Sequence, residues 1–125
     1  MLGNSNVVAV VAVKDQATGN EFYGGTLSLQ ESDMDEPGGT LYSCGGGSLL
    51  LVYESSYAGT NQATAASWQV SDIEQEISEL TAKGVSFEHY DLPDTTREGD
   101  VHVLGGLKAA WFKDPDGNIL NIVSR

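Results

Sequence analysis

The side chains of this sequence that could take part in chemistry are few and well separated. Asn121 stands in the otherwise apolar run Ile119 to Val123, four residues after Gly117. The two histidines, His89 and His102, flank the segment 91 to 106. An amide in an apolar strand either orients a bound ligand or hydrogen-bonds neighbouring backbone, and the sequence leaves both readings open. The imidazoles could bind a metal or serve as hydrogen-bond partners, but no His-x-x-x-His spacing supports a metal site.

The remaining reactive groups do not form a recognisable catalytic set. Cys44 is the only cysteine, so no internal disulfide can form, and this fits a reducing cytoplasm. It precedes three glycines with no histidine nearby in sequence, which disfavours a nucleophilic thiol. Pro37 and the lack of a loop-closing glutamate argue against a calcium loop at 33–36, so this acidic run is predicted to be a solvated loop.

Composition places the chain among globular proteins and narrows its partners. With 125 residues, 40% of them hydrophobic and 19% charged, it can form one domain with a real core. The net charge of −12 disfavours nucleic acid and anionic membranes as partners. It would attract a cationic ligand, although solubility alone also explains it. The apolar run Val7 to Val13 is too short to span a membrane and has no basic residues before it.

Hydrophobic periodicity predicts two consecutive copies of one order of elements, strand-helix-strand-strand-strand. The first copy comprises a strand at 7–13, a helix at 17–23, and strands at 26–30, 40–43 and 48–53. The second comprises a strand at 67–70, a helix from 71, and strands at 85–90, 107–113 and 119–123. We therefore expect a single domain, 1–125, with module one at about 6–54, a linker at about 55–64 and module two at about 65–124. The segment 91 to 106 is expected to be an irregular, mobile flap.

Local signals are clearest around the second helix and the last turn. Ser71 and Glu74 have the spacing of a capping box, which predicts Ser71 as the N-cap. The stretch Asp114-Pro115-Asp116-Gly117 predicts a tight hairpin, because Pro fixes the first corner and Gly supplies a positive φ.

These elements carry a resemblance to a known superfamily. A strand ending Val13-Lys14-Asp15, the pair Phe22-Tyr23, a second strand ending at Asp72, and the hairpin Trp111 to Asn118 resemble the vicinal oxygen chelate superfamily. Its members include glyoxalase I, bleomycin-resistance proteins, fosfomycin-resistance proteins and extradiol dioxygenases. The resemblance covers essentially the whole chain and implies an α+β fold of two βαβββ modules. Their strands would form the curled mixed sheet of the glyoxalase/bleomycin resistance/dioxygenase-like fold, commonly in a homodimer.

The chain departs from the superfamily at one turn and at the metal site. Leu27-Ser28-Leu29 stands where the superfamily usually has Leu-Gly-Leu. The positions that match the metal ligands are Val8, Ala65, Asn121 and a residue of the strand 49–53. Valine and alanine cannot coordinate a cation, and one neutral amide is a weak substitute for a carboxylate. The resemblance therefore points to the metal-free, ligand-sequestering branch, with no cofactor.

Strand alternation predicts which side chains would line the cup that the resemblance implies. Val8, Ser67, Gln69 and Asn121 would face the ligand, with Trp111, Tyr42 and Tyr53 as stacking surfaces, although core packing is an alternative for each aromatic. We expect a cytoplasmic protein that sequesters a small hydrophobic or cationic compound in this apolar cup. The alternative is a lyase or dioxygenase-like enzyme that uses a relocated metal near His89 and His102, or acid–base chemistry without a metal.

Overall fold

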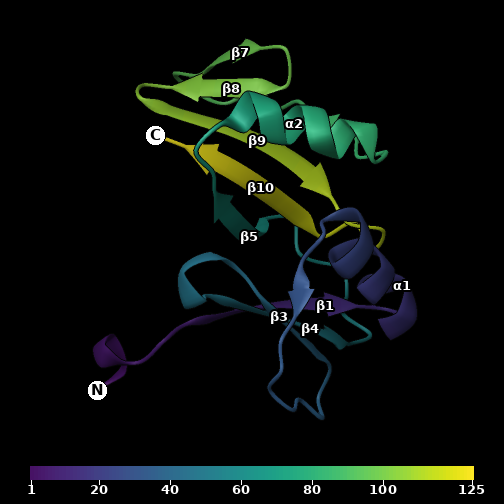
Figure 1. Cartoon of the computed structure of the whole chain (residues 1–125). Helices are drawn as coiled ribbons and strands as arrows, with labels where there is room; N and C mark the ends of the chain where they lie inside the picture. The colour runs from purple at the N-terminus through teal and green to yellow at the C-terminus, as the bar shows by residue number, and fades with distance from the viewer. The chain divides into compact units, whose positions relative to one another are not determined.

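The computed structural model describes all 125 residues, which divide into two compact units (Figure 1). The first comprises residues 1–60 together with 115–118, and the second comprises 61–114 together with 119–125. The boundary between residues 60 and 61 falls inside the segment 55–64 that was expected to be a linker.

The first unit follows the predicted order of one strand, one helix and three strands. Its elements are η1 (Leu2–Asn4), β1 (Val8–Val13), α1 (Gln16–Asn20), η2 (Glu21–Thr26), β2 (Gln30–Glu31), β3 (Thr40–Ser43), η3 (Gly45–Gly47) and β4 (Leu49–Glu54). The strands form a sheet in the order β1-β4-β3-β2, in which β1 and β4 are parallel and the other pairs are antiparallel. The prediction of a strand at 26–30 is wrong, because only Gln30 and Glu31 pair with β3.

The first helix begins one residue earlier than predicted and changes its winding. The Asp15 carboxylate caps it by accepting hydrogen bonds from the Thr18 N–H at 2.9 Å and the Thr18 hydroxyl at 2.8 Å. These two bonds stabilise the charged form, and they lower the pKa of Asp15. Beyond Asn20 the chain continues as the π-helical turn η2, whose end leads to Ser28 with a φ of +59°. That left-handed backbone explains why glycine would suit the position of Ser28.

The core of the first unit lies on the face of the sheet toward the helical segment. The side chains on this face alternate with those on the other, and the most deeply buried are Val11, Val13, Leu50 and Val52 together with Tyr23 of η2. The opposite face carries Val8 and Val10, which are 37% and 50% exposed. One face of this sheet is therefore a closed core, and the other presents apolar side chains.

The predicted hairpin turn belongs to the first unit and bonds the rest of that unit through its side chains. The Lys14 N–H donates to the Asp116 carboxylate at 3.0 Å, and the Asn118 amide donates to the Ala12 carbonyl at 2.7 Å. Asn118 also accepts from the Gly59 N–H at 3.2 Å, and a Cβ at Gly59 would collide with the Asp116 carbonyl oxygen. Gly117 has the positive φ that the sequence predicted, at +92°. The polar residues of this turn thus bond backbone groups that are distant in sequence.

The second unit repeats the topology of the first and adds a hairpin. Its elements are β5 (Thr64–Gln69), α2 (Ile73–Ala82), β6 (Phe87–Glu88), β7 (Thr96–Glu98), β8 (Val101–Leu104), β9 (Leu107–Lys113) and β10 (Ile119–Ser124). The sheet order is β5-β10-β9-β8-β7, and β6 also pairs with β9. As in the first unit, the first and last strands are parallel and the last two are antiparallel. The expected repeat of βαβββ modules in an α+β fold is confirmed.

Three local predictions for the second unit are wrong. The N-cap of α2 is Asp72, whose carboxylate accepts from the Gln75 N–H at 3.1 Å, and not Ser71. The strand expected at 85–90 is reduced to Phe87 and Glu88. The segment 91–106 is not an irregular flap, because it contains the paired strands β7 and β8.

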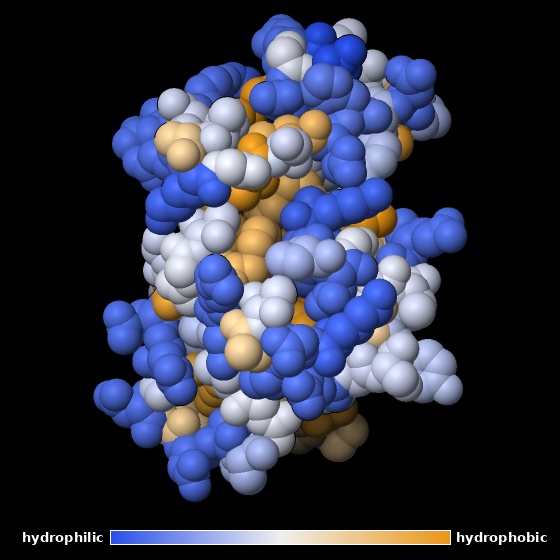
Figure 2. Space-filling view, turned by 90° about the vertical axis from the view of Figure 1, so that its right-hand side faces the viewer, coloured by the Kyte–Doolittle hydropathy of each residue, from blue (hydrophilic) through white to orange (hydrophobic).

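Helix α2 covers one face of the second sheet, across β9 and β10 (Figure 1). The buried side chains on this face include Ile73 and Leu80 from α2, Ala110 and Phe112 from β9, and Leu120 and Ile122 from β10. Apolar burial of this kind stabilises the unit. None of the helices has the length and apolar content that a membrane-spanning helix needs. Hydrophilic side chains dominate the surface seen in Figure 2, with most hydrophobic ones recessed between them.

Candidate ligand-binding face

The face of the second sheet that points away from α2 collects the polar residues that could contact a ligand. The register places Asn121 directly opposite Trp111 on one side and Ser67 on the other. Directly opposed residues of neighbouring strands project to the same face, and residues two apart in a strand share it. We call this surface the Trp111 face and define it by Ser67, Gln69, Tyr90, His102, Trp111 and Asn121.

Three aromatic rings form the centre of the Trp111 face. The His102 ring meets Trp111 edge to face with centroids 4.9 Å apart, and Tyr90 meets Trp111 at 5.5 Å. The Tyr90 and His102 rings are 6.1 Å apart. The indole N–H of Trp111 donates to the Thr64 hydroxyl at 3.1 Å, which fixes the orientation of the ring. Together the three rings form one aromatic cluster.

The Trp111 face contains three buried polar atoms that have no hydrogen-bond partner in the chain. They are the Tyr90 hydroxyl oxygen, Nδ1 of His102 and Oδ1 of Asn121. Only 1% of His102 and 7% of Asn121 is exposed. A buried polar group without a partner costs about 1–3 kcal/mol, so most proteins avoid such groups. No other buried side-chain nitrogen or oxygen of the chain lacks a partner, which makes this concentration on one face informative.

The protonation of His102 follows from its one hydrogen bond. The Tyr90 backbone N–H donates to Nε2 of His102 at 3.0 Å. A nitrogen that accepts a hydrogen bond carries no proton, so the imidazole is neutral and its proton is on Nδ1. The atom of His102 without a partner is therefore a buried N–H donor.

His89 lies in a separate cluster beside this face, and both of its nitrogens are occupied. Its Nε2 is 2.7 Å from the Asp100 carboxylate, and its Nδ1 is 3.2 Å from the Arg97 guanidinium. Arg97 also donates to the Gly99 carbonyl at 2.9 Å. These contacts hold β7 and β8 against the segment after β6. The segments 85–90 and 100–104 do not pair with each other, because β6 and β8 each pair with β9.

The structure brings four of the residues expected to bind ligand onto one surface. Asn121 is buried and Trp111 is half-buried, while Ser67 and Gln69 are exposed on the neighbouring edge strand β5. Trp68 lies on the other face, because it alternates with Ser67 along β5. Tyr90 was not among the residues expected to bind ligand, and His102 was expected to be either a metal ligand or a hydrogen-bond partner.

The other three expected ligand-binding residues belong to the first unit and do not share one face. Val8 and Tyr53 lie on its more exposed face, since Val8 pairs with Leu49 and Tyr53 with Ala12. Tyr42 lies on the opposite face, 3% exposed, and its hydroxyl donates to the Asn20 side chain at 3.0 Å. Its placement is that of a core residue, the alternative considered for each aromatic.

The residues at the superfamily's metal positions do not form a metal site. In the first unit, Val8 and the strand β4 offer apolar side chains and the Tyr53 hydroxyl. In the second unit, the Ala65 side chain has no atom that can coordinate a cation, and Asn121 has one amide oxygen. Nowhere do three His, Cys, Asp or Glu side chains gather in a way that could hold an ion. A divalent cation needs several charged or imidazole donors, and this donor set does not fit it.

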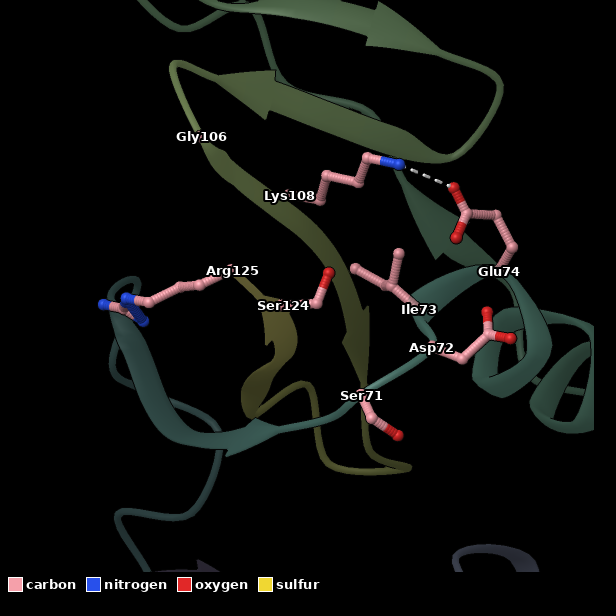
Figure 3. Close-up of a pocket in the computed structure, with 8 residues that line it drawn as sticks. All are labelled: Ser71, Asp72, Ile73, Glu74, Gly106, Lys108, Ser124 and Arg125. Atoms are coloured by element: carbon pink, nitrogen blue, oxygen red, sulfur yellow. Dashed lines mark hydrogen bonds and ion pairs between the residues drawn. The ribbon is translucent and has the colours of Figure 1, made fainter.

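A pocket of about 290 Å³ lies at the N-terminus of α2 (Figure 3). It is lined by Ser71, Asp72, Ile73, Glu74, Gly106, Lys108, Ser124 and Arg125. The Lys108 ammonium is already paired with the Glu74 carboxylate at 3.1 Å. Lys108 lowers the pKa of Glu74, chiefly through this hydrogen bond. The pocket has no unpartnered buried group, and we do not assign it a ligand.

Comparisons with known proteins identify the fold through solved structures. No family model matches the sequence. No curated protein matches it either. A member of the glyoxalase/bleomycin resistance protein/dioxygenase superfamily from Sphaerobacter thermophilus DSM 20745 is similar with a TM-score of 0.68 and 22% identity, covering 100% of both chains. A lactoylglutathione lyase from Agrobacterium tumefaciens has a TM-score of 0.68 and 14% identity, covering 96% of this chain and 93% of its own.

An antibiotic binding protein from Streptomyces sp. CB03234 is also similar, with a TM-score of 0.64 and 18% identity, covering 97% of each chain. The same architecture therefore occurs in an enzyme and in a binding protein. The chain has the fold of the glyoxalase/bleomycin resistance/dioxygenase superfamily, as the sequence motifs predicted.

Proposed function

We propose that this protein binds a small organic molecule on the Trp111 face and sequesters it without a metal ion. The observation that carries the proposal is the set of three buried polar atoms without partners around Trp111. A ligand that bonds these atoms would remove their desolvation cost and would gain contact area on the aromatic rings. The likeness to an antibiotic binding protein agrees with this reading.

The proposal of a metal-free protein rests on the donor set. The Lewis-acid chemistry of the superfamily's enzymes needs a cation held by several side chains, and here valine, alanine and one amide stand at the matching positions. His89 cannot replace them without losing its contacts to Asp100 and Arg97. His102 would have to break its bond with the Tyr90 N–H or bind through the buried Nδ1 alone.

Two measurements test this function. Elemental analysis of untagged protein, followed by calorimetric titration with Mn²⁺ and Zn²⁺, should give well below one tightly bound ion per chain. A thermal-shift screen of small aromatic compounds, neutral and cationic, should then find ligands. A compound present at 100 times its Kd stabilises the folded state by about 2.7 kcal/mol, a rise of about 10 °C in Tm for a chain of 125 residues.

Matched variants connect any ligand to the proposed face. Asn121→Leu removes the buried acceptor while keeping the side chain's size, and it should reduce the thermal shift. Gln75→Leu makes the same kind of change on the exposed surface of α2 and should leave the shift unchanged. A stoichiometric ion lost on His102→Ala would instead favour the lyase or dioxygenase-like alternative and contradict the proposal.

We also propose that the protein works in the cytoplasm as a homodimer. Val8 and Val10 lie on the edge strand β1 and are 37% and 50% exposed, which favours association through this face. Light scattering coupled to gel filtration should give twice the mass of 13.2 kDa for the wild type and a lower mass for Val10→Asp. A wild-type mass of one chain at micromolar concentration would contradict the dimer.

A further inference from the structure

We infer that His102 is the residue that selects the ligand, and that the ligand is an uncharged aromatic compound carrying both a hydrogen-bond acceptor and a hydrogen-bond donor. The inference rests on the proposed function of the Trp111 face and specifies the chemistry that this face recognises. It assigns His102 the role of a neutral donor, where the sequence left open a metal ligand or a hydrogen-bond partner.

The direction of the His102 hydrogen bond determines what a ligand must offer. Nε2 is committed as the acceptor of the Tyr90 N–H at 3.0 Å, so Nδ1–H is a donor that requires an acceptor. The ring cannot turn over to present the other nitrogen without leaving the Tyr90 N–H unpaired. It is also fixed by its edge-to-face contact with Trp111, with centroids 4.9 Å apart. A ligand atom that meets Nδ1 must therefore be an acceptor such as a carbonyl oxygen.

Asn121 adds the opposite requirement. Its buried Oδ1 is an acceptor without a partner and needs a donor on the ligand. Asn121 is paired with Trp111 across β9 and β10, and the His102 ring contacts the Trp111 ring. The Tyr90 hydroxyl can donate or accept and so adapts to either group. The ligand thus meets one obligatory donor, one obligatory acceptor and one group that can act as either.

The charge of these groups favours a neutral ligand. Oδ1 of Asn121 and Nδ1–H of His102 are both neutral and both buried, in residues that are 7% and 1% exposed. A buried charge needs a charged partner, and neither atom supplies one. The net charge of −12 would attract cations to the surface, but the surface charge does not provide a counter-ion at these two atoms.

Four probes with one aromatic ring system test this selection by calorimetry. They are 2-naphthamide, which has an acceptor and a donor, 2-methylnaphthalene, which has neither, 2-naphthoate, which is anionic, and 2-naphthylmethylammonium, which is cationic. We expect 2-naphthamide to bind about tenfold more tightly than each of the others, the ratio that about 1.4 kcal/mol of hydrogen bonding gives.

Two substitutions separate the two nitrogens of His102. His102→Gln places an amide near Nε2, so it can keep the bond to the Tyr90 N–H while losing the Nδ1–H donor. His102→Asn places its amide near Nδ1, so it keeps a donor there and loses the Tyr90 bond. The preference for 2-naphthamide should disappear in His102→Gln and persist in His102→Asn. His89→Gln is the matched control outside the site and should leave the preference unchanged.

A spectroscopic measurement on the wild type does not depend on how the variants fold. Long-range ¹H–¹⁵N correlation spectra should show His102 protonated on Nδ1, with a resonance that moves when 2-naphthamide binds. A proton on Nε2, an Nδ1 resonance that does not move, a charged probe that binds most tightly, or four equal affinities would each overturn the inference. In the last two cases the face would still be a binding site. If none of the four probes binds at millimolar concentration, the proposed function fails as well.

Discussion

The unpartnered hydroxyl of Tyr90 predicts a stability change of unusual sign. Replacing a buried tyrosine with phenylalanine ordinarily destabilises a protein, because a hydrogen bond is lost. The Tyr90 hydroxyl is buried and makes no such bond. Tyr90→Phe therefore removes a desolvated hydroxyl without breaking any hydrogen bond. An unsatisfied buried polar group costs about 1–3 kcal/mol, and we expect the free energy of unfolding to rise by about 1–2 kcal/mol.

Tyr42→Phe is the matched control, since it removes the same hydroxyl oxygen from a tyrosine whose hydroxyl has a hydrogen-bond partner. The Tyr42 hydroxyl donates to Oδ1 of Asn20 at 3.0 Å, and Asn20 keeps a second bond from the Gln16 amide at 3.1 Å. Tyr42→Phe should therefore cost about 1 kcal/mol, the net worth of one ordinary hydrogen bond. The two variants should differ by about 2–3 kcal/mol with opposite signs relative to the wild type.

Urea unfolding and calorimetry measure this difference directly. An unfolding entropy of about 2.1 cal/mol/K per residue gives about 0.26 kcal/mol/K for 125 residues, so 1 kcal/mol corresponds to about 4 °C in Tm. Tyr90→Phe should melt about 4–8 °C higher than the wild type, and Tyr42→Phe about 4 °C lower. If Tyr90→Phe is instead destabilised by 1 kcal/mol or more, a bound water already satisfies the hydroxyl, and the reasoning about the Trp111 face is refuted.

Three further predictions concern the scaffold. Ser28 has a φ of +59°, so Ser28→Gly should be about 1 kcal/mol more stable than Ser28→Ala in urea unfolding, and equal stabilities would contradict the left-handed backbone. Asp72→Ala should lose about 1 kcal/mol by the same measurement while Ser71→Ala changes little, because only Asp72 caps α2; the reverse order would restore Ser71 as the cap. Burial, and then the charge of Glu31, raise the pKa of Tyr42 above its ordinary value of 10.0. The folded state then keeps a proton that the unfolded chain releases, so urea midpoints should fall as pH rises past 10.0, more steeply in the wild type than in Tyr42→Phe; parallel curves would contradict this.

The fold could be predicted from the sequence because its signals are local and repeated. The strand 107–113 was predicted with the bounds that β9 has, and a helix was predicted where α2 lies. The turn at Gly117 has the expected positive φ. The contacts of the motif at 114–118 could not be predicted from the sequence, because Asp116 and Asn118 bond backbone groups about sixty to a hundred residues away in the chain.

The site was less predictable because it depends on register and not on pattern. Alternation correctly grouped Ser67 with Gln69, but the sequence cannot say that Tyr42 pairs with Leu50 and so lies on the core face. Both Ser71 and Asp72 are good N-cap residues, and only the backbone decides between them. Tyr90 follows a strand of two residues, too short for any periodicity, so nothing in the sequence signalled its place beside His102 and Trp111.

The distribution of polar groups argues that the Trp111 face is kept for binding. A folded domain is stable by about 5–15 kcal/mol, so three unpartnered buried atoms at about 1–3 kcal/mol each are a large burden. Each could be removed by a conservative change, such as Tyr90→Phe or Asn121→Leu, without loss of packing. Random placement would scatter such atoms over both units, yet all three lie around one tryptophan. A ligand that returns the lost hydrogen bonds explains both the cost and the clustering, and the stabilised Tyr90→Phe variant should then bind that ligand more weakly than the wild type.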